Sequence, residues 1–97
     1  MPLKEWEILL PDGFKIFVRR ETLLGKWTDF AVILVFNECI TRYDCSHDYP
    51  HRDVLGREAG LIRKEKCWNM TMKEAFGQAI LDLESNYKQY HKFFTSH

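Results

Sequence analysis

The sequence predicts an α+β fold, in which an antiparallel sheet of four to five strands is packed by one long C-terminal helix. Three observations lead to this prediction. Short apolar runs separated by turn-forming residues fill the first half of the chain, as in strands joined by hairpins. Residues 30–36 are apolar without interruption, which is typical of a strand covered on both faces. After residue 71, apolar side chains recur every three or four positions, as on one face of a helix.

The first two predicted strands, residues 5–10 and 14–20, are separated by Pro11-Asp12-Gly13. Proline presets the first torsion of a turn, aspartate bonds to the backbone that follows it, and glycine adopts the left-handed conformation at the exit. Residues 14–20 then alternate between apolar and charged side chains, which is the period of a half-buried strand. We therefore expect a hairpin at the start of the chain.

Further strands are predicted where β-branched and aromatic residues gather or alternate with polar ones, at residues 27–36, 39–44 and 61–68. Residues 21–26 are expected to form a short connection, and Asn37-Glu38 a tight turn between two antiparallel strands. Residues 45–60 are expected to be irregular, because polar residues and glycine dominate them.

The C-terminal helix has the clearest local signals. Thr71 is followed three residues later by Glu74, which is a capping box that satisfies backbone N–H groups at a helix start. From there, apolar residues follow the helical period, at Phe76, Ala79, Ile80, Leu83, Tyr87, Tyr90 and Phe94. The pattern predicts an amphipathic helix of about 20 residues, about 30 Å long.

The length and charge of the chain limit the classes of protein that it can belong to. Its 97 residues are enough for a single domain, which we place at residues 1–97. Lys and Arg number 14 and Asp and Glu also number 14, so the basic excess of a polybasic nucleic-acid binder is missing. With 45% hydrophobic residues, the chain is able to form a core, which excludes a disordered tail.

The cysteines and apolar runs point to a reduced compartment. Three cysteines are an odd number and too few for a disulfide scaffold. Charges interrupt every apolar run near the N-terminus, unlike a signal peptide, and the longest apolar run is far shorter than the about 20 residues of a membrane helix. We expect a cytoplasmic protein that does not span a membrane. Because no phosphate-binding or dinucleotide motif is present, no cofactor is expected.

Several predicted strands are apolar on both faces, as shown by Ile16 and Phe17, or by Ile33 and Leu34. One helix covers only one face of a sheet, and large exposed apolar patches are uncommon on monomers. The second sheet face therefore needs a partner, and self-association is the simplest solution. The sequence predicts a homodimer through this face.

Chemically active side chains are concentrated in the segment from residue 42 to residue 53, after an apolar strand. The candidate catalytic residues are Arg42, Asp44, His47, His51, Arg52 and Asp53. In one interpretation, the two histidines transfer protons near neutral pH, the two arginines hold a phosphate group, and the aspartates orient them, as in a metal-independent ribonuclease. In the other interpretation, Arg42–Asp44 and Arg52–Asp53 are structural ion pairs and His51 bonds to the backbone.

A metal site is a third interpretation of the same segment. Cys45, His47 and His51, with Cys67 as a fourth ligand, offer donor types that bind Zn²⁺. The helical spacing of the two histidines is interrupted by Pro50, and no zinc-binding spacing such as C-x-x-C is present. These residues are therefore weak metal candidates.

The run Arg42-Tyr43-Asp44, the loop with Pro50-His51 and the helix that follows resemble the TumE-like toxins, which are small α+β proteins of toxin–antitoxin gene pairs. The resemblance covers residues 30–90. It departs from the family pattern at Cys45 and after His51, where the family loop is richer in histidine. What the resemblance implies is a cytoplasmic toxin that acts on RNA and is neutralised by an antitoxin protein.

Overall fold

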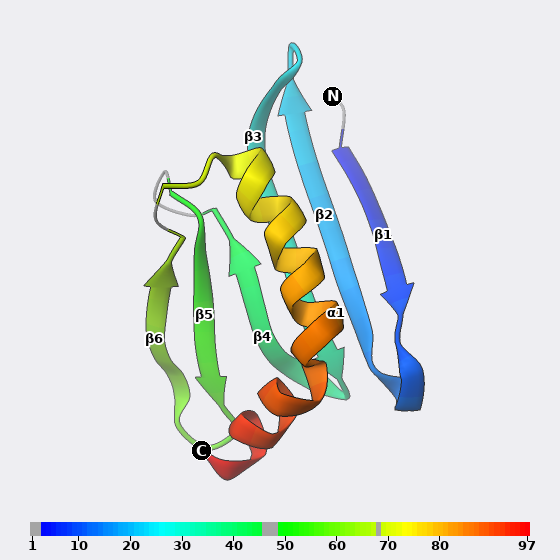
Figure 1. Cartoon of the computed structure of the whole chain (residues 1–97), viewed down its shortest axis with the longest axis vertical. Helices are drawn as coiled ribbons and strands as arrows, with labels where there is room; N and C mark the ends of the chain where they lie inside the picture. The colour runs from blue at the N-terminus through cyan, green and yellow to red at the C-terminus, as the bar shows by residue number, and fades with distance from the viewer. Residues whose placement is uncertain (1–2, 46–48, 68) are drawn as a thin grey trace.

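The computed structural model describes residues 3–45, 49–67 and 69–97, which form an antiparallel sheet and one long helix (Figure 1). Within these residues the sheet has six strands, in the order β1-β2-β3-β4-β5-β6. They are β1 (Leu3–Leu9), β2 (Lys15–Leu23), β3 (Lys26–Phe36), β4 (Glu38–Asp44), β5 (His51–Gly56) and β6 (Gly60–Lys66). The helix is α1 (Met72–Ser96). The α+β prediction is confirmed, with more strands than the four to five expected.

The first connection of the sheet lies where it was expected, and the next two are shorter than expected. The turn between β1 and β2 is a single 3-10 turn (Pro11–Gly13), as the proline-aspartate-glycine sequence predicts. Strands β2 and β3 extend into the expected connection and meet at Leu24-Gly25, where both residues have positive φ. Asn37 alone, at φ 58°, turns β3 into β4. Asparagine tolerates this left-handed conformation better than most residues, which permits so tight a connection.

Strand β5 lies inside the segment that was expected to be irregular, so that expectation was wrong. β5 pairs antiparallel with β4 on one side and with β6 on the other. Its first residues are polar, and their charges are satisfied by side chains from those two neighbouring strands. A polar segment becomes a central strand here because long-range pairing outweighs the local preference for a loop.

Helix α1 begins as the sequence predicts. The Thr71 side chain accepts a hydrogen bond from the Glu74 amide, and the Glu74 carboxylate accepts one from the Thr71 amide. The helix runs for 25 residues rather than about 20 and changes direction at Asn86, where φ is −125°. Among the described residues, no helix is both long and apolar enough to cross a membrane.

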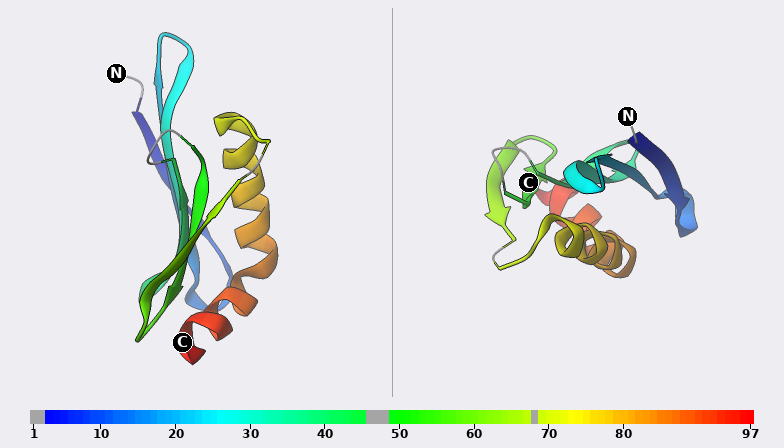
Figure 2. Two further views of the ribbon diagram at one scale, coloured as in Figure 1. Left: turned by 90° about the vertical axis from the view of Figure 1, so that its left-hand side faces the viewer. Right: turned by 90° about the horizontal axis from the view of Figure 1, so that it is seen from above.

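The sheet and the helix form two layers, and the sheet curves around α1 (Figure 2). The core between them is made by Phe14, Ile16, Val18, Phe30, Val32, Leu34, Ile40, Ala75, Ala79, Leu83 and Phe94, with Cys45. At the C-terminal end, the amides of Arg57 and Ala59 donate to the carbonyls of Phe94 and His97. These two bonds fix the end of α1 against the turn between β5 and β6.

The strand register assigns each side chain to a face of the sheet. One row across the six strands faces α1: Trp6, Val18, Val32, Tyr43, Arg52 and Glu65. The neighbouring row faces away: Glu7, Phe17, Ile33, Arg42, Asp53 and Lys64. We call this second side the helix-free face, because no element of the described residues covers it (Figure 2). The expectation that β3 is covered on both faces is therefore not met within one chain.

Candidate functional site

Pairing between β4 and β5 divides the candidate residues between the two faces of the sheet. Arg42 lies opposite Asp53, and Asp44 lies opposite His51. Tyr43 contacts the helix through Asp82, so its neighbours on β4 point to the helix-free face, because side chains alternate along a strand. Arg42, Asp44, His51 and Asp53 therefore meet on the helix-free face.

Asp53 is the centre of this group and is fully buried. Its Oδ2 atom accepts a hydrogen bond from Arg42 Nε at 2.6 Å, and its Oδ1 atom accepts one from Lys64 Nζ at 2.9 Å. The three residues come from β4, β5 and β6, so the carboxylate links three strands. We call Arg42, Asp44, His51, Asp53 and Lys64 the ion-pair cluster.

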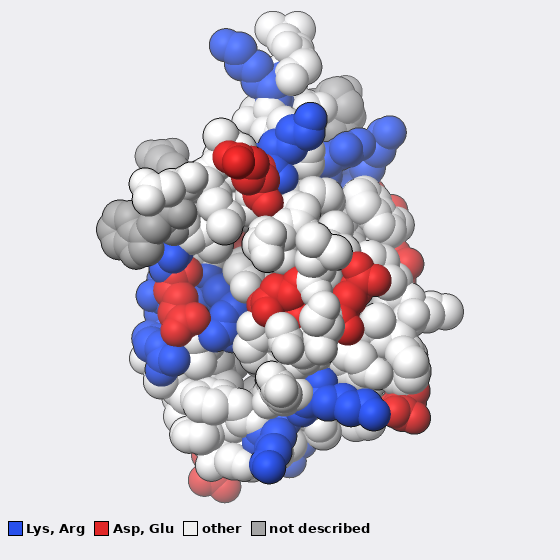
Figure 3. Space-filling model, in the orientation of Figure 1, with Lys and Arg blue, Asp and Glu red and all other residues white. Residues whose placement is uncertain are grey.

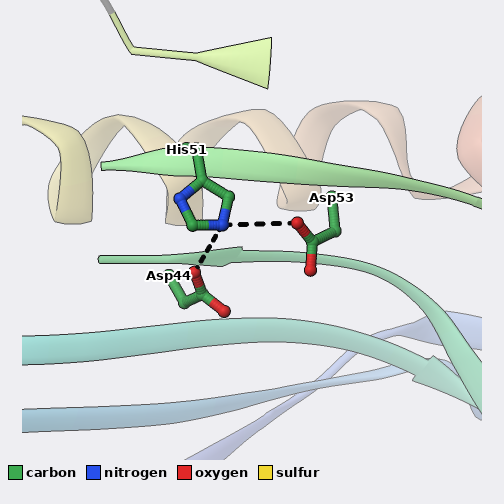
Figure 4. A group of neighbouring side chains, drawn as sticks. All are labelled: Asp44, His51 and Asp53. Atoms are coloured by element: carbon green, nitrogen blue, oxygen red, sulfur yellow. Dashed lines mark ion pairs between the residues drawn. The ribbon is translucent and has the colours of Figure 1, made fainter. Parts of the chain in front are cut away.

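His51 is also fully buried and lies between the two carboxylates (Figure 4). Its Nε2 atom is 2.8 Å from Asp44 Oδ1 and 3.3 Å from Asp53 Oδ1. Because carboxylate oxygens only accept hydrogen bonds, Nε2 carries the hydrogen and donates it to Asp44. The Nδ1 atom is 3.4 Å from the Tyr49 carbonyl oxygen. Both ring nitrogens therefore face protein groups.

The charges of the cluster favour an ionised Asp53. Burial alone would raise the pKa of the Asp53 carboxyl, but the hydrogen bonds from Lys64 and Arg42 outweigh it and hold the pKa below its ordinary value. The same hydrogen bond raises the pKa of Arg42, against the opposing effect of burial. Asp53 is thus an anion at neutral pH, compensated by two cations.

Arg52 lies on the opposite face and belongs to a different group of side chains. Its guanidinium donates to Glu65 Oε1 at 2.8 Å and to Thr41 Oγ1 at 3.1 Å, and it lies 4.7 Å from the centre of the Tyr90 ring. The expected Arg52–Asp53 ion pair does not form, because adjacent residues of a strand point to opposite faces. Asp53 pairs with Arg42 instead, with 2.6 Å between Asp53 Oδ2 and Arg42 Nε. The expected Arg42–Asp44 ion pair is present as well, with 3.9 Å between Arg42 Nε and Asp44 Oδ2.

Asp82 on α1 joins the helix to the sheet and was not selected from the sequence. It accepts hydrogen bonds from the hydroxyls of Tyr43 and Tyr90 and from the Asn86 amide. Burial, and then the hydrogen bond to Asp82, raises the pKa of Tyr90 to about 12, so this phenol remains a donor at neutral pH. Three residues spaced along one face of the helix, at positions 82, 86 and 90, and the strand residue at position 43 have polar atoms that a core pattern does not predict.

The six candidate catalytic residues are therefore only partly brought together. Arg42, Asp44, His51 and Asp53 share the ion-pair cluster, Arg52 lies on the other side of the sheet, and His47 lies outside the described residues. Arg42 and Arg52 do not face one another, so they are unable to hold one phosphate between them. His51 is buried, and Asp44 is the member of the histidine–carboxylate pair that reaches the surface, at 25% exposure.

Metal donors also group differently from the set proposed from the sequence. Asp44, His51 and Asp53 offer ligand atoms within 4.8 Å of one another. Lys64 Nζ is 2.9 Å from Asp53 Oδ1 and 3.2 Å from His51 Nε2, so a metal ion would have to displace this ammonium group. Cys45 is buried in the core cluster, and burial raises the pKa of Cys67, which disfavours the thiolate that binds Zn²⁺.

A hollow of about 440 Å³ adjoins Asp44. Its lining residues come from β2, β3 and the end of β4: Arg19, Thr28, Asp29, Ala31, Asp44 and Cys45. Arg19 and Asp29 form a 2.6 Å ion pair in its wall, and each is about one-third exposed. The exposed part of Asp44 therefore faces a polar space that also contains a guanidinium.

Comparison with known families finds a match that covers residues 1–97. The matching family is described as a domain of unknown function, DUF7718. The chain belongs to this family. DUF7718 carries no assigned activity in its description, and it does not point to the TumE-like toxins. Searches of curated proteins and of solved structures found no significant match.

Proposed function

We propose that this DUF7718 protein is a non-enzymatic binding protein that associates with a second copy of itself through the helix-free face. The observation that carries the proposal is the arrangement of charge and apolar surface on that face. The row through Ile33 begins with Glu7 on β1 and ends with Lys64 on β6. The adjacent row begins with Glu5 on β1 and ends with Lys66 on β6.

The middle of the helix-free face is apolar. Phe17, Ile33 and Val35 lie on β2 and β3 and are only half-buried in the single chain. A two-fold axis that runs parallel to the strands over β3 would place Ile33 and Val35 against their copies. The β1 glutamates of one chain would then lie toward the β5–β6 side of the other chain, where the β6 lysines are. Since the sheet is curved, contact is centred on β2 to β4, and the long charged side chains span the wider gap at the edges.

The ion-pair cluster supports a binding role over catalysis. Asp53 and His51 have no exposed surface, and the polar atoms of both are occupied by charged or backbone neighbours. Such a cluster connects β4, β5 and β6 and keeps the helix-free face in one shape. In this role the carboxylates and the histidine shape an interface, and no proton transfer is required of them.

Ile33→Lys should abolish self-association, because it places two like charges at the centre of the interface. We expect the wild-type chain to have a mass of twice 11.6 kDa by light scattering at high micromolar concentration, and the variant to have 11.6 kDa. Leu81→Lys is the matched control, because Leu81 is an exposed apolar residue of α1, at 60% exposure, on the other layer. A wild-type monomer, or an Ile33→Lys variant that remains dimeric, would overturn the proposal.

The resemblance to toxins gives a second candidate function, cleavage of RNA by a toxin that an antitoxin protein neutralises. The observation that favours it is the position of Asp44, which faces a polar hollow while His51 orients it from behind at 2.8 Å. Asp44 would take the proton of the ribose 2′-hydroxyl as its oxygen attacks phosphorus, and Arg19 or Arg42 would hold the phosphate. The bond from phosphorus to the 5′-oxygen would break, and that oxygen would take a proton from water. His51 would be a positioning residue in such a site, together with Asp53.

This second function predicts that Asp44→Asn and His51→Ala abolish growth inhibition when the protein is expressed, together with cleavage of total RNA. Asp44→Asn preserves the side-chain shape, so soluble yield and circular dichroism should match those of the wild type. Asp12→Asn, an exposed carboxylate on the turn between β1 and β2 and outside the hollow, is the control that should retain toxicity. Absence of growth inhibition by the wild type, or full toxicity of Asp44→Asn, counts against the ribonuclease hypothesis.

A further inference from the structure

A second cavity lies on the helix side of the sheet, apart from the ion-pair cluster. It has a volume of about 220 Å³ and lies between β5, β6 and the last turns of α1. Its lining residues are Arg52, Val54, Arg63, Gln89, Tyr90 and Phe93. Figure 3 views the molecule from this side and shows basic and acidic side chains gathered over β5 and β6.

The lining of this cavity carries positive charge. Two of its six lining residues are arginines, and none of the six is acidic. Glu65 compensates part of this charge from the rim, where Oε1 accepts from Arg52 at 2.8 Å and Oε2 accepts from Arg63 at 3.1 Å. One carboxylate thus bridges two guanidinium groups, and the three side chains together carry a net charge of about +1. An anion is therefore the ligand that these groups favour.

The two arginines have different roles. Arg52 is held in place by Thr41, Glu65 and the Tyr90 ring, and only 13% of its side chain is exposed. Arg63 is 55% exposed and is bound only to Glu65 among the partners that the structure records for it. A fixed guanidinium inside the cavity and a more exposed one at its rim are placed to bind one anionic group together.

The other lining residues of the cavity determine which chemical group can carry the anionic group of the ligand. Val54 and Phe93 are apolar, Tyr90 presents its ring, and Gln89 offers an amide. The volume is below the about 300–1,000 Å³ of sites for drug-sized ligands, so it suits a single ring. We propose that this cavity binds a small organic anion, namely a carboxylate or phosphate carried on one flat ring. The site does not depend on self-association, because its lining residues lie on α1 or on the face of the sheet that packs against α1.

The test is a titration of the ¹⁵N-labelled full chain, followed by NMR, with benzoate, phenyl phosphate, inorganic phosphate and the neutral analogue benzamide. Benzoate or phenyl phosphate should shift the amide signals of β5, β6 and the end of α1. Inorganic phosphate should bind more weakly because it lacks the ring, and benzamide should bind more weakly because it lacks the charge. No shifts with either ring-bearing anion, or equal binding of benzamide, would overturn the proposal.

Two variants locate the binding. Arg63→Gln should weaken the anion about tenfold, because it removes one charge-assisted hydrogen bond. Glu65→Gln should strengthen the anion, because the internal carboxylate no longer competes for the two guanidiniums. Arg57→Gln is the matched control, since Arg57 forms a similar ion pair with Glu38 outside the cavity and should leave the affinity unchanged. An unchanged affinity in both cavity variants contradicts the proposed site.

Discussion

Asp53→Ala should lower the free energy of unfolding by about 3 kcal/mol. Breaking a buried ion pair by removing one partner costs about 3–5 kcal/mol, because the remaining charge loses its compensation. Here the value falls at the lower end, because the side chains of Arg42 and Lys64 are 44% and 35% exposed and are able to turn toward water. His51 is fully buried and is unable to turn toward water, so it loses its contact with Asp53 without a replacement. Urea denaturation followed by circular dichroism measures the change.

Asp29→Ala is the matched control for this prediction. Asp29 pairs with Arg19 at 2.6 Å, the same distance as Asp53 and Arg42, but both partners are about one-third exposed. Exposed ion pairs contribute about 0.2–1 kcal/mol, so this variant should remain near wild-type stability. Equal losses in the two variants would show that burial of Asp53 is not what makes its charge important.

The pH dependence of stability gives a second readout of the same carboxyl. The pKa of Asp53 is lower in the folded chain than in the unfolded chain. Its contribution is therefore present above the unfolded value and is lost as the pH falls through the folded value. Asp53→Asn should show a shallower loss of stability on acidification than the wild type. A parallel loss in both would assign the acid sensitivity to other groups.

Features set by local sequence were predicted well. The capping box of Thr71 and Glu74 marks the start of α1, and the proline-aspartate-glycine turn marks the first hairpin. Both depend on contacts within a few residues, which the sequence shows directly. Strand β5 was missed because its stability comes from pairing with β4 and β6, and a polar segment gives no local sign of that pairing.

Only part of the candidate site was predicted, because the positions of its side chains also depend on strand pairing. Sequence proximity grouped Arg52 with Asp53, but strand alternation sends the two side chains to opposite faces. Once β5 is known to be a strand, this division follows from the register alone. The link between Asp82 and Tyr43 spans 39 positions, and only the packing of α1 against β4 brings the two residues together. No local pattern contains that information.

Phe30→Ala should cause the largest loss of stability among the substitutions considered, about 4 kcal/mol. Phe30 is fully buried under α1 and packs edge-on against Phe76, with ring centres 5.8 Å apart. Replacing a buried phenylalanine with alanine costs about 3–5 kcal/mol, because transfer energy is lost and a cavity remains. Fluorescence or circular dichroism during urea denaturation should show a lower midpoint with an unchanged slope.

Phe17→Ala is the comparison variant for Phe30→Ala, because it makes the same substitution on the helix-free face instead of in the core. Phe17 lies on β2 opposite Ile33 and is only half-buried in one chain. At a low concentration, at which the chain is a monomer, Phe17→Ala should lower the free energy of unfolding much less than Phe30→Ala does. If the proposed self-association occurs, the difference between the two losses should narrow at high concentration, because association would stabilise the wild type and Phe17→Ala would weaken the interface. If the difference between the two losses of stability does not depend on concentration, no second copy is bound to the helix-free face. Packing against α1 would then be the reason that Phe30 contributes more to stability than Phe17.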